Sequence, residues 1–469
     1  MERKNVWEKA SETRAVQMEA FAREYMTFLS EGKTERECVK LVKRELEAAG
    51  YRRLEEAGRL LWGDKVYTTC MNKAVVAFCI GDEPLTEGMN ILGAHIDSPR
   101  LDIKQNPLYE DGGFALLDTH YYGGIKKYQW VTIPLAIHGL VALKDGRRVE
   151  IAVGEAEDDP VFFVSDLLIH LAQEQLEKKA GKVIEGEALD VIVGNRPLVI
   201  EETEDKKKEK DPVKAGVLAI LKRDYDIEEE DFLSAELEVV PAGRARFAGF
   251  DRSMILGYGH DDRVCAYASL RAMLEVEMPK RTTCLILVDK EEIGSVGATG
   301  MQSKFFENAV AEVMHLADVC GYSDLRLRRV LARSTMLSSD VSSAFDPAFA
   351  SSFDKKNVAR LGGGMVFNKF TGARGKYDSN DANAEYLAHI RHIMDEAEVV
   401  FQTAELGRVD LGGGGTIAYI LALYGMNVVD CGVAVLNMHA PWEAVSVADV
   451  YEAKRGYRAF LEGACRVLE

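Results

Sequence analysis

Three carboxylates follow a short apolar run near the middle of the chain. The run is Leu285–Val288, and Asp289, Glu291 and Glu292 come just after it. An apolar run bounded by a turn signal is typical of a buried strand in a parallel sheet. In open α/β sheets, ligands and catalytic groups lie just beyond the carboxyl ends of the strands. The sequence therefore predicts a site here, where one of two adjacent glutamates binds a metal ion and the other moves a proton of water.

Further acidic residues and two histidines also lie at or near the ends of apolar segments. Together with the two glutamates they form the set His95, Asp261, Glu291, Glu292, Asp340 and His439. Imidazole and carboxylate groups are ligands for zinc or a related divalent metal. Asp97 follows His95 at a spacing that allows a carboxylate to orient a metal-binding imidazole through its other ring nitrogen.

Each of these residues has an ordinary explanation when it is taken alone. A single histidine near a strand end is usually a structural residue. An acidic pair such as Asp261–Asp262 is common at a helix N-terminus, where the helix dipole favours negative charge. The hypothesis of a metal site therefore depends on the joint pattern and not on any single residue.

Five short motifs in this set resemble, in order and spacing, the metal motifs of the M18 family of zinc aminopeptidases, which includes aspartyl aminopeptidase. They read His95-Ile-Asp-Ser-Pro, Gly-His-Asp261-Asp-Arg, Asp289-Lys-Glu-Glu-Ile-Gly-Ser, Ser-Ser-Asp340 and Asn-Met-His439. The resemblance runs from the first predicted helices to the last. It implies a metal-dependent aminopeptidase that acts on peptides with a free N-terminus.

The resemblance also implies a set of metal ligands. Asp261 would bridge two divalent metal ions, one held also by His95 and Asp340 and the other by Glu292 and His439. Oxygen and nitrogen ligands suit Zn²⁺, and they leave Mn²⁺ and Co²⁺ open. A water between the metals would be the nucleophile.

Three further roles follow from the same resemblance. Glu291 would be the general base, and Asp97 would orient His95. In related folds the bridging aspartate often precedes a cis peptide, so a cis bond is expected between Asp261 and Asp262. A histidine of the family that corresponds to His170 reaches the active site of a neighbouring subunit, although the surrounding Asp166–Leu171 by itself predicts an apolar helical stretch packed in a core.

The elements around these motifs predict an α/β fold, a metallopeptidase sheet with helices on both faces. Helices are expected early in the chain, where Thr34 and Glu37 form a capping-box pattern. Short alternating segments between Gly, Asp and Pro predict an inserted β-rich lid or oligomerisation domain. The expected domains are 1–103 (first part of the catalytic domain), 104–250 (insert) and 251–469 (second part of the catalytic domain).

The composition excludes several partners. A net charge of -18 over 469 residues argues against nucleic acid or an anionic membrane as the main partner. Eight cysteines without C-x-x-C spacing indicate reduced thiols, and neither a secretory signal nor a membrane-spanning run is recognised, so a cytoplasmic location is expected. The resemblance implies a homo-oligomer, since members of the family form closed dodecameric shells.

Two other functions and the substrate preference remain open from the sequence alone. The same centre could serve an amidase or deacylase acting on non-peptide amides, or the chain could be a binding shell without catalysis. Phe367 occupies the position where a lysine for acidic substrates is expected, and Lys369 would share its face of a strand. The glycines Gly412–Gly415 could cradle an anion or form a turn with unusual backbone angles.

Overall fold

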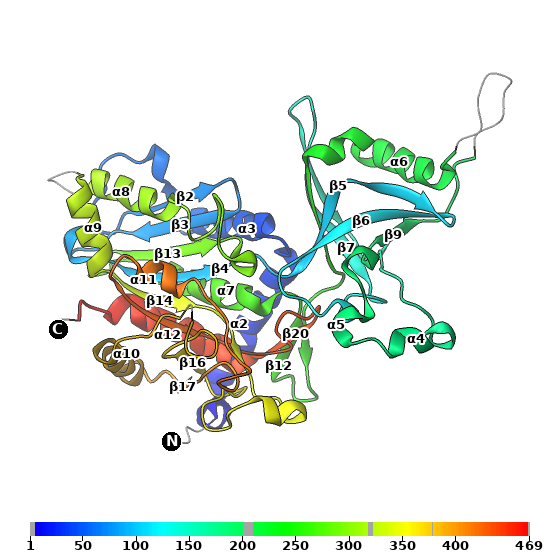
Figure 1. Ribbon diagram of the computed structural model, residues 1–469. Coiled ribbons are helices and arrows are strands. Elements are labelled where there is room, and N and C mark those ends of the chain that lie inside the picture. The colour runs from blue at the N-terminus through cyan, green and yellow to red at the C-terminus, as the bar shows by residue number, and fades with distance from the viewer. Residues whose placement is uncertain (1–4, 200–209, 318–321, 378, 468–469) are drawn as a thin grey trace. The chain divides into compact units, whose positions relative to one another are not determined.

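The computed structural model describes residues 5–199, 210–317, 322–377 and 379–467, which form two compact units (Figure 1). The first unit comprises Met1–Ser98, Ala245–Met438 and Trp442–Glu469. The second comprises Pro99–Arg244 with His439–Pro441. The first unit is therefore discontinuous in sequence, and the long insert begins and ends a few residues before the 104–250 limits expected from the sequence.

The first unit is built on a mixed sheet of nine strands. In spatial order the strands are β1 (Arg52–Arg53), β2 (Lys65–Cys70), β3 (Ala74–Cys79), β13 (Thr283–Val288), β4 (Asn90–His95), β14 (Thr335–Ser339), β18 (Asn427–Gly432), β16 (Met365–Asn368) and β17 (Phe401–Thr403). Its centre is parallel, because β4 pairs in parallel with both β13 and β14, and β14 pairs in parallel with β18. The predicted α/β class is confirmed.

Helices cover both faces of this sheet. Neighbouring strand residues point to opposite faces: Leu92 and Leu285 join one apolar cluster, whereas Ile91 and Ile286 join the other. The first cluster includes α2 (Glu12–Glu31), α3 (Glu35–Ala48), α7 (His260–Leu274), α10 (Ala384–Glu396) and α12 (Val447–Gly463). The second includes α8 (Phe305–Ala317), α9 (Asp324–Arg333) and α11 (Ala418–Ala422). A short helix, α1 (Val6–Lys9), precedes them.

A smaller sheet of five strands completes the first unit. Its order is β11 (Arg246–Ala248), β12 (Met254–Gly257), β20 (Glu443–Ser446), β19 (Ala434–Leu436) and β15 (Ser342–Ser343). Strand β12 leads into α7, and β20 pairs antiparallel with β12. This pairing brings β20 next to the strand that precedes α7.

The second unit is β-rich, as the alternating pattern predicts. Its sheet is antiparallel, in the order β8 (Arg148–Val153), β7 (Leu135–Ala142), β10 (Ala235–Pro241), β5 (Arg100–Asp111), β6 (Phe114–Tyr122) and β9 (Val191–Gly194). Its helices are α4 (Gln173–Leu176), α5 (Ala180–Val183) and α6 (Pro212–Tyr225).

Candidate metal centre

Four elements of the first unit direct polar side chains to the carboxyl edge of the parallel strands. Strand β4 ends at His95, and its parallel neighbour β13 ends opposite it at Val288. The short 3₁₀ helix η7 (Glu291–Ile293) follows β13, and Asp340 follows β14. Asp261 lies in the first turn of α7. Because parallel strands end at the same edge of a sheet, residues far apart in sequence meet there.

His95 lies at the centre of this group. Its Nε2 lies 3.1 Å from Oδ1 of Asp261, 3.9 Å from Oδ1 of Asp340 and 3.9 Å from Oε2 of Glu291. The imidazole is almost fully buried, with 1% of its side-chain surface exposed. Nε2 is therefore the ring atom that faces the carboxylates of Asp261, Asp340 and Glu291.

Two overlapping groups of side chains have the spacing of metal ligands. One is His95, Asp261 and Glu292, and the other is His95, Glu291 and Asp340; within each, one ligand atom per residue lies within 4.8 Å of the others. A donor set of imidazole nitrogen and carboxylate oxygen fits zinc and related divalent ions. The residues present therefore suit a metal at this position.

The electrostatics of the group also favour a cation. Burial, followed by the charges of Asp262 and Asp261, raises the pKa of Asp340 well above its usual range. Burial alone would lower the pKa of His95, but the carboxylates of Asp261 and Asp97 raise it well above its ordinary value. Buried carboxylates at this density repel one another, and a bound divalent ion would relieve that repulsion.

Asp97 makes more contacts than the orientation of one histidine requires. Nδ1 of His95 lies 3.0 Å from the carbonyl oxygen of Asp97 and 3.3 Å from its Oδ1. The same carboxylate accepts the backbone N–H of Glu291 at Oδ1 and that of Glu292 at Oδ2, each at 3.2 Å. Asp97 therefore fixes the backbone of the two adjacent glutamates as well as the imidazole.

The sequence does not reveal two buried residues that contact Asp261. Oε2 of Glu443 accepts its backbone N–H at 3.0 Å, and Oγ of Ser98 donates to its carbonyl oxygen at 2.6 Å. Ser98 could have been singled out, because it lies inside the motif His95-Ile-Asp-Ser-Pro. The sequence marks Glu443 only by its position four residues after His439. The peptide bond between Asp261 and Asp262 is cis, which confirms that expectation.

The two remaining predicted histidines belong to the second unit. Nδ1 of His439 lies 2.8 Å from the carbonyl oxygen of Gly124. His170 lies in the 3₁₀ helix Ile169–Leu171 and is exposed. The predicted apolar helix packed in a core is therefore wrong for this segment, because Leu168, Ile169 and Leu171 expose more than half of their surface.

Two segments that were considered for contacts with substrate have structural explanations. Phe367 lies within β16 and is buried in the core. Strand β16 ends at Asn368, so the exposed Lys369 lies past the strand. The expectation that Lys369 shares a strand face with Phe367 is therefore wrong. In the glycine run, a Cβ on Gly412 would lie 1.7 Å from the carbonyl oxygen of Leu406, and Gly413 has a φ of +118°. The glycines therefore permit a tight turn, and α11 begins only at Ala418 and is five residues long.

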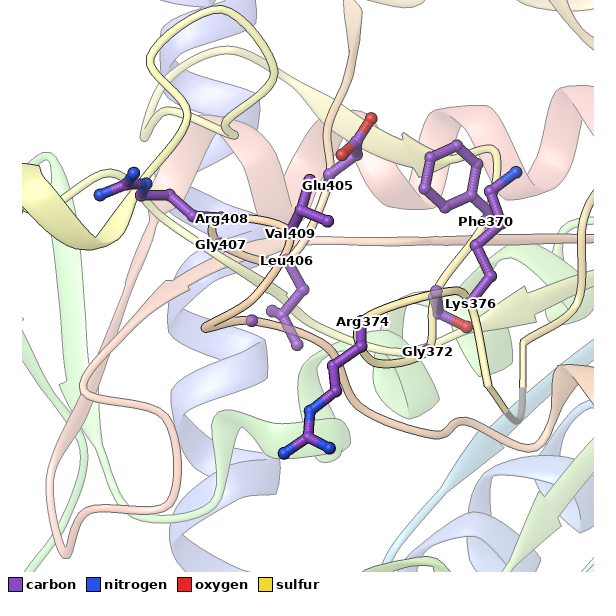
Figure 2. Close-up of a pocket in the computed structure, with 11 residues that line it drawn as sticks. Phe370, Gly372, Arg374, Lys376, Glu405, Leu406, Gly407, Arg408 and Val409 are labelled. Atoms are coloured by element: carbon purple, nitrogen blue, oxygen red, sulfur yellow. The ribbon is translucent and has the colours of Figure 1, made fainter.

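A small hollow lies beside this turn (Figure 2). Its volume is about 50 Å³, which is enough for water molecules. The guanidinium groups of Arg374 and Arg408 extend in different directions (Figure 2), and Nζ of Lys376 pairs with Asp381 at 2.9 Å. The cations that line the hollow therefore do not converge on one anion.

Comparison with known proteins agrees with this geometry. Residues 28–461 match the sequence profile of a family described as aminopeptidase I zinc metalloprotease (M18). The chain belongs to the M18 family. A probable M18 family aminopeptidase 1 of Clostridium acetobutylicum is 59% identical over 465 residues, which cover 98% of each chain. This M18 chain is therefore a metalloaminopeptidase of a family that uses zinc.

Solved structures agree with this assignment. The crystal structure of an M18 family aminopeptidase from Thermotoga maritima matches with a TM-score of 0.93 and 45% identity, covering 99% of this chain and 100% of that one. The S. cerevisiae mApe1 dodecamer matches with a TM-score of 0.73, covering 94% and 95%, but its 20% identity supports only a shared fold. No helix within the described part of this M18 chain is long and apolar enough to cross a membrane.

Proposed function

We propose that the chain removes the first residue of peptides with a free N-terminus at a centre of two divalent metal ions. The observation that carries this proposal is the convergence of His95 with four carboxylates from three further elements at one edge of the sheet. Asp261 would bridge the ions, His95 and Asp340 would hold one, and Glu292 and His439 the other. The hydrogen bond of His439 Nδ1 to Gly124 supports the ligand role of His439, because such bonds commonly set the tautomer of a metal-binding imidazole.

The residues of the chain would then divide the chemistry among them. When bound, the metal ions would polarise the scissile carbonyl and make water nucleophilic near neutral pH. The carboxylate of Glu291 would take a proton from that water and pass it to the leaving amine. Asp97 would keep Glu291 and Glu292 in register with His95, because it holds the backbone of both and contacts the imidazole.

The base role of Glu291 is tested by Glu291→Gln, which keeps the shape of the side chain and removes its ability to accept a proton. We expect kcat on aminoacyl p-nitroanilides to fall by about 10²- to 10⁴-fold, with the metal content unchanged. Glu396→Gln replaces an exposed glutamate of α10 in the same way and should leave kcat unaltered. Near wild-type turnover of metal-loaded Glu291→Gln would rule out the role.

Chelation and acylated substrates test the remainder of the proposal. A chelator should abolish turnover, and restoring Zn²⁺, Mn²⁺ or Co²⁺ separately should identify the ion that supports it. Peptides whose N-terminus is acetylated should not be cleaved. Equal cleavage of free and acetylated peptides would instead indicate the amidase alternative.

The proposal extends to assembly and location. We propose a homo-oligomer, with the inserted unit in an oligomerisation or lid role; the exposed apolar side chains of Leu168, Ile169 and Leu171 support this, since such patches commonly mark interfaces. We propose a dodecamer because the resemblance to the M18 family implies one, and the S. cerevisiae mApe1 dodecamer shares the fold of this chain. The seven cysteines of the described residues are all free thiols, which agrees with a reducing, cytoplasmic location.

A further inference from the structure

The main chain of Asp261 is held on both sides by side chains that are distant in sequence. Glu443 accepts its N–H, and Ser98 donates to its carbonyl oxygen. Asp261 is 3% exposed, and Ser98 and Glu443 are each 1% exposed. These hydrogen bonds are therefore shielded from water, where losing one leaves a buried polar group unsatisfied.

The backbone around Asp261 explains why its buried N–H needs an acceptor from elsewhere. Asp261 (φ -77°, ψ 108°) and Asp262 (φ -114°, ψ 28°), at the start of α7, do not have helical backbone angles. Gly259, two residues before Asp261, has a φ of +75° and no side chain. A Cβ at Gly259 would lie 2.3 Å from Nη1 of Arg263 and 2.9 Å from Oγ of Ser98. Gly259 therefore offers no side-chain acceptor, and the carboxylate of Glu443 accepts the N–H of Asp261.

Strand pairing fixes the position of Glu443. It is the first residue of β20 and lies directly opposite Gly257, the last residue of β12, in the antiparallel register. Strand β12 is the one that leads into α7. The same pair of strands therefore leads to Asp261 and positions the carboxylate that accepts its N–H.

We propose that Glu443 and Ser98 are positioning residues that fix the main chain of Asp261 so that its carboxylate can bind metal. This inference rests on the proposed role of Asp261 as the bridging ligand. The aspartate side chain has only two rotatable bonds, so the location of its carboxylate follows the backbone closely. Partners that orient a ligand typically contribute about 10- to 100-fold to metal affinity.

The test is the affinity of the full-length protein for Zn²⁺, measured by competition with a fluorescent zinc chelator. Ser98→Ala and Glu443→Ala should each weaken it by about 10- to 100-fold. Glu443→Gln keeps an oxygen acceptor and should bind within about threefold of wild type, a rescue expected if the hydrogen bond is what matters. Thermal unfolding with and without Zn²⁺ should show a smaller metal-induced rise in Tm for the two alanine variants.

Matched controls separate positioning from general loss of packing. Ser269→Ala removes a hydroxyl on α7 that is buried and, within the described residues, has no hydrogen-bond partner. Ser446→Ala removes a hydroxyl from the last residue of β20, and the Ser446 side chain does not cap α12. Both should bind Zn²⁺ with wild-type affinity. Because Glu443→Ala leaves a cavity that threatens folding, Ser98→Ala is the decisive variant.

Asp261→Ala distinguishes failure of the inference from failure of the proposed function. If Asp261→Ala lowers Zn²⁺ affinity while folded Ser98→Ala and Glu443→Ala bind as wild type, the positioning role is refuted and the ligand role stands. If Asp261→Ala itself binds Zn²⁺ as wild type, the ligand role is refuted and the inference falls with it. Equal losses in Glu443→Gln and Glu443→Ala would refute the hydrogen-bond account for Glu443.

Discussion

Asp449 is a buried carboxylate that holds a loop through two hydrogen bonds, and its effect on the stability of the fold depends on pH. Its Oδ2 accepts the backbone N–H of Gly362 at 2.8 Å, and its Oδ1 accepts that of Gly364 at 2.7 Å. Burial nevertheless raises its pKa from 3.8 to about 8, with the two backbone hydrogen bonds opposing the shift. Because folding raises the pKa of Asp449, its protonation stabilises the folded chain. This stabilisation is complete below about pH 4 and is lost as the pH rises through about 8.

Comparison of wild type with Asp449→Asn isolates this contribution. The variant does not titrate, but it replaces one acceptor oxygen with an N–H₂ group and should be less stable at pH 5. Between pH 4 and pH 8 the wild type should lose up to about 1.4 kcal/mol per pH unit from this group. The gap in Tm between the two proteins should therefore narrow as the pH rises. A gap that stays constant or widens would contradict the raised pKa.

Helix α3 shows which elements can be recognised from local sequence. Thr34 and Glu37 form the predicted capping box: Oγ1 of Thr34 accepts the N–H of Glu37 at 3.2 Å, and Oε2 of Glu37 accepts the N–H of Thr34 at 3.0 Å. All of the partners lie within one turn, so the sequence alone could indicate the start of this helix. The main chain of Asp261 could not be explained in that way, because its partner Glu443 lies on β20, 182 positions away in sequence.

Thr34→Ala should destabilise the chain by about 1 kcal/mol, because an orphan N–H of α3 loses its acceptor. Chemical unfolding measures the loss, and hydrogen exchange at the Glu37 amide should become faster. Thr27→Ala is the matched control: it removes an exposed threonine within α2 whose hydroxyl donates to the carbonyl oxygen of Arg23 in the same helix. Similar destabilisation by both substitutions would show that the cap has no special role.

At the scale of the whole molecule, His170 gives a test of shared active sites. The resemblance implies that this histidine acts in a neighbouring subunit, and its exposure on the second unit is compatible with such a role. Co-expression of His170→Ala and Glu291→Gln chains, followed by purification of mixed assemblies through two tags, should restore activity that neither variant has alone. Sites would then form that combine an intact Glu291 with an intact His170.

A second mixture serves as the control for this experiment. Glu291→Gln combined with Asp340→Ala should show no recovery, because both residues belong to the first unit and each site keeps one defect. Absence of recovery in the His170 mixture as well would place His170 outside a shared site. Recovery in both mixtures would show that Glu291 and Asp340 also act from different chains, so the result would not single out His170.

The sequence by itself determined the features that depend on local pattern and motif. Apolar runs of strand length predicted β4 and β13, and ordered motifs singled out His95, Asp261 and the two glutamates. The fold class follows from the same alternation of strands and helices. Periodicity and capping chemistry act over a few residues, so they can be recognised without tertiary contacts.

Only the tertiary structure decided how distant segments meet. The parallel register of β4 with β13 and β14 brings the candidate ligands together, and the pairing of β12 with β20 brings Glu443 to Asp261 across 182 positions of sequence. It also exposed His170, against the expectation of core packing from local composition. Burial and long-range hydrogen bonds depend on which surfaces pack against each other, and a single segment of sequence does not specify that.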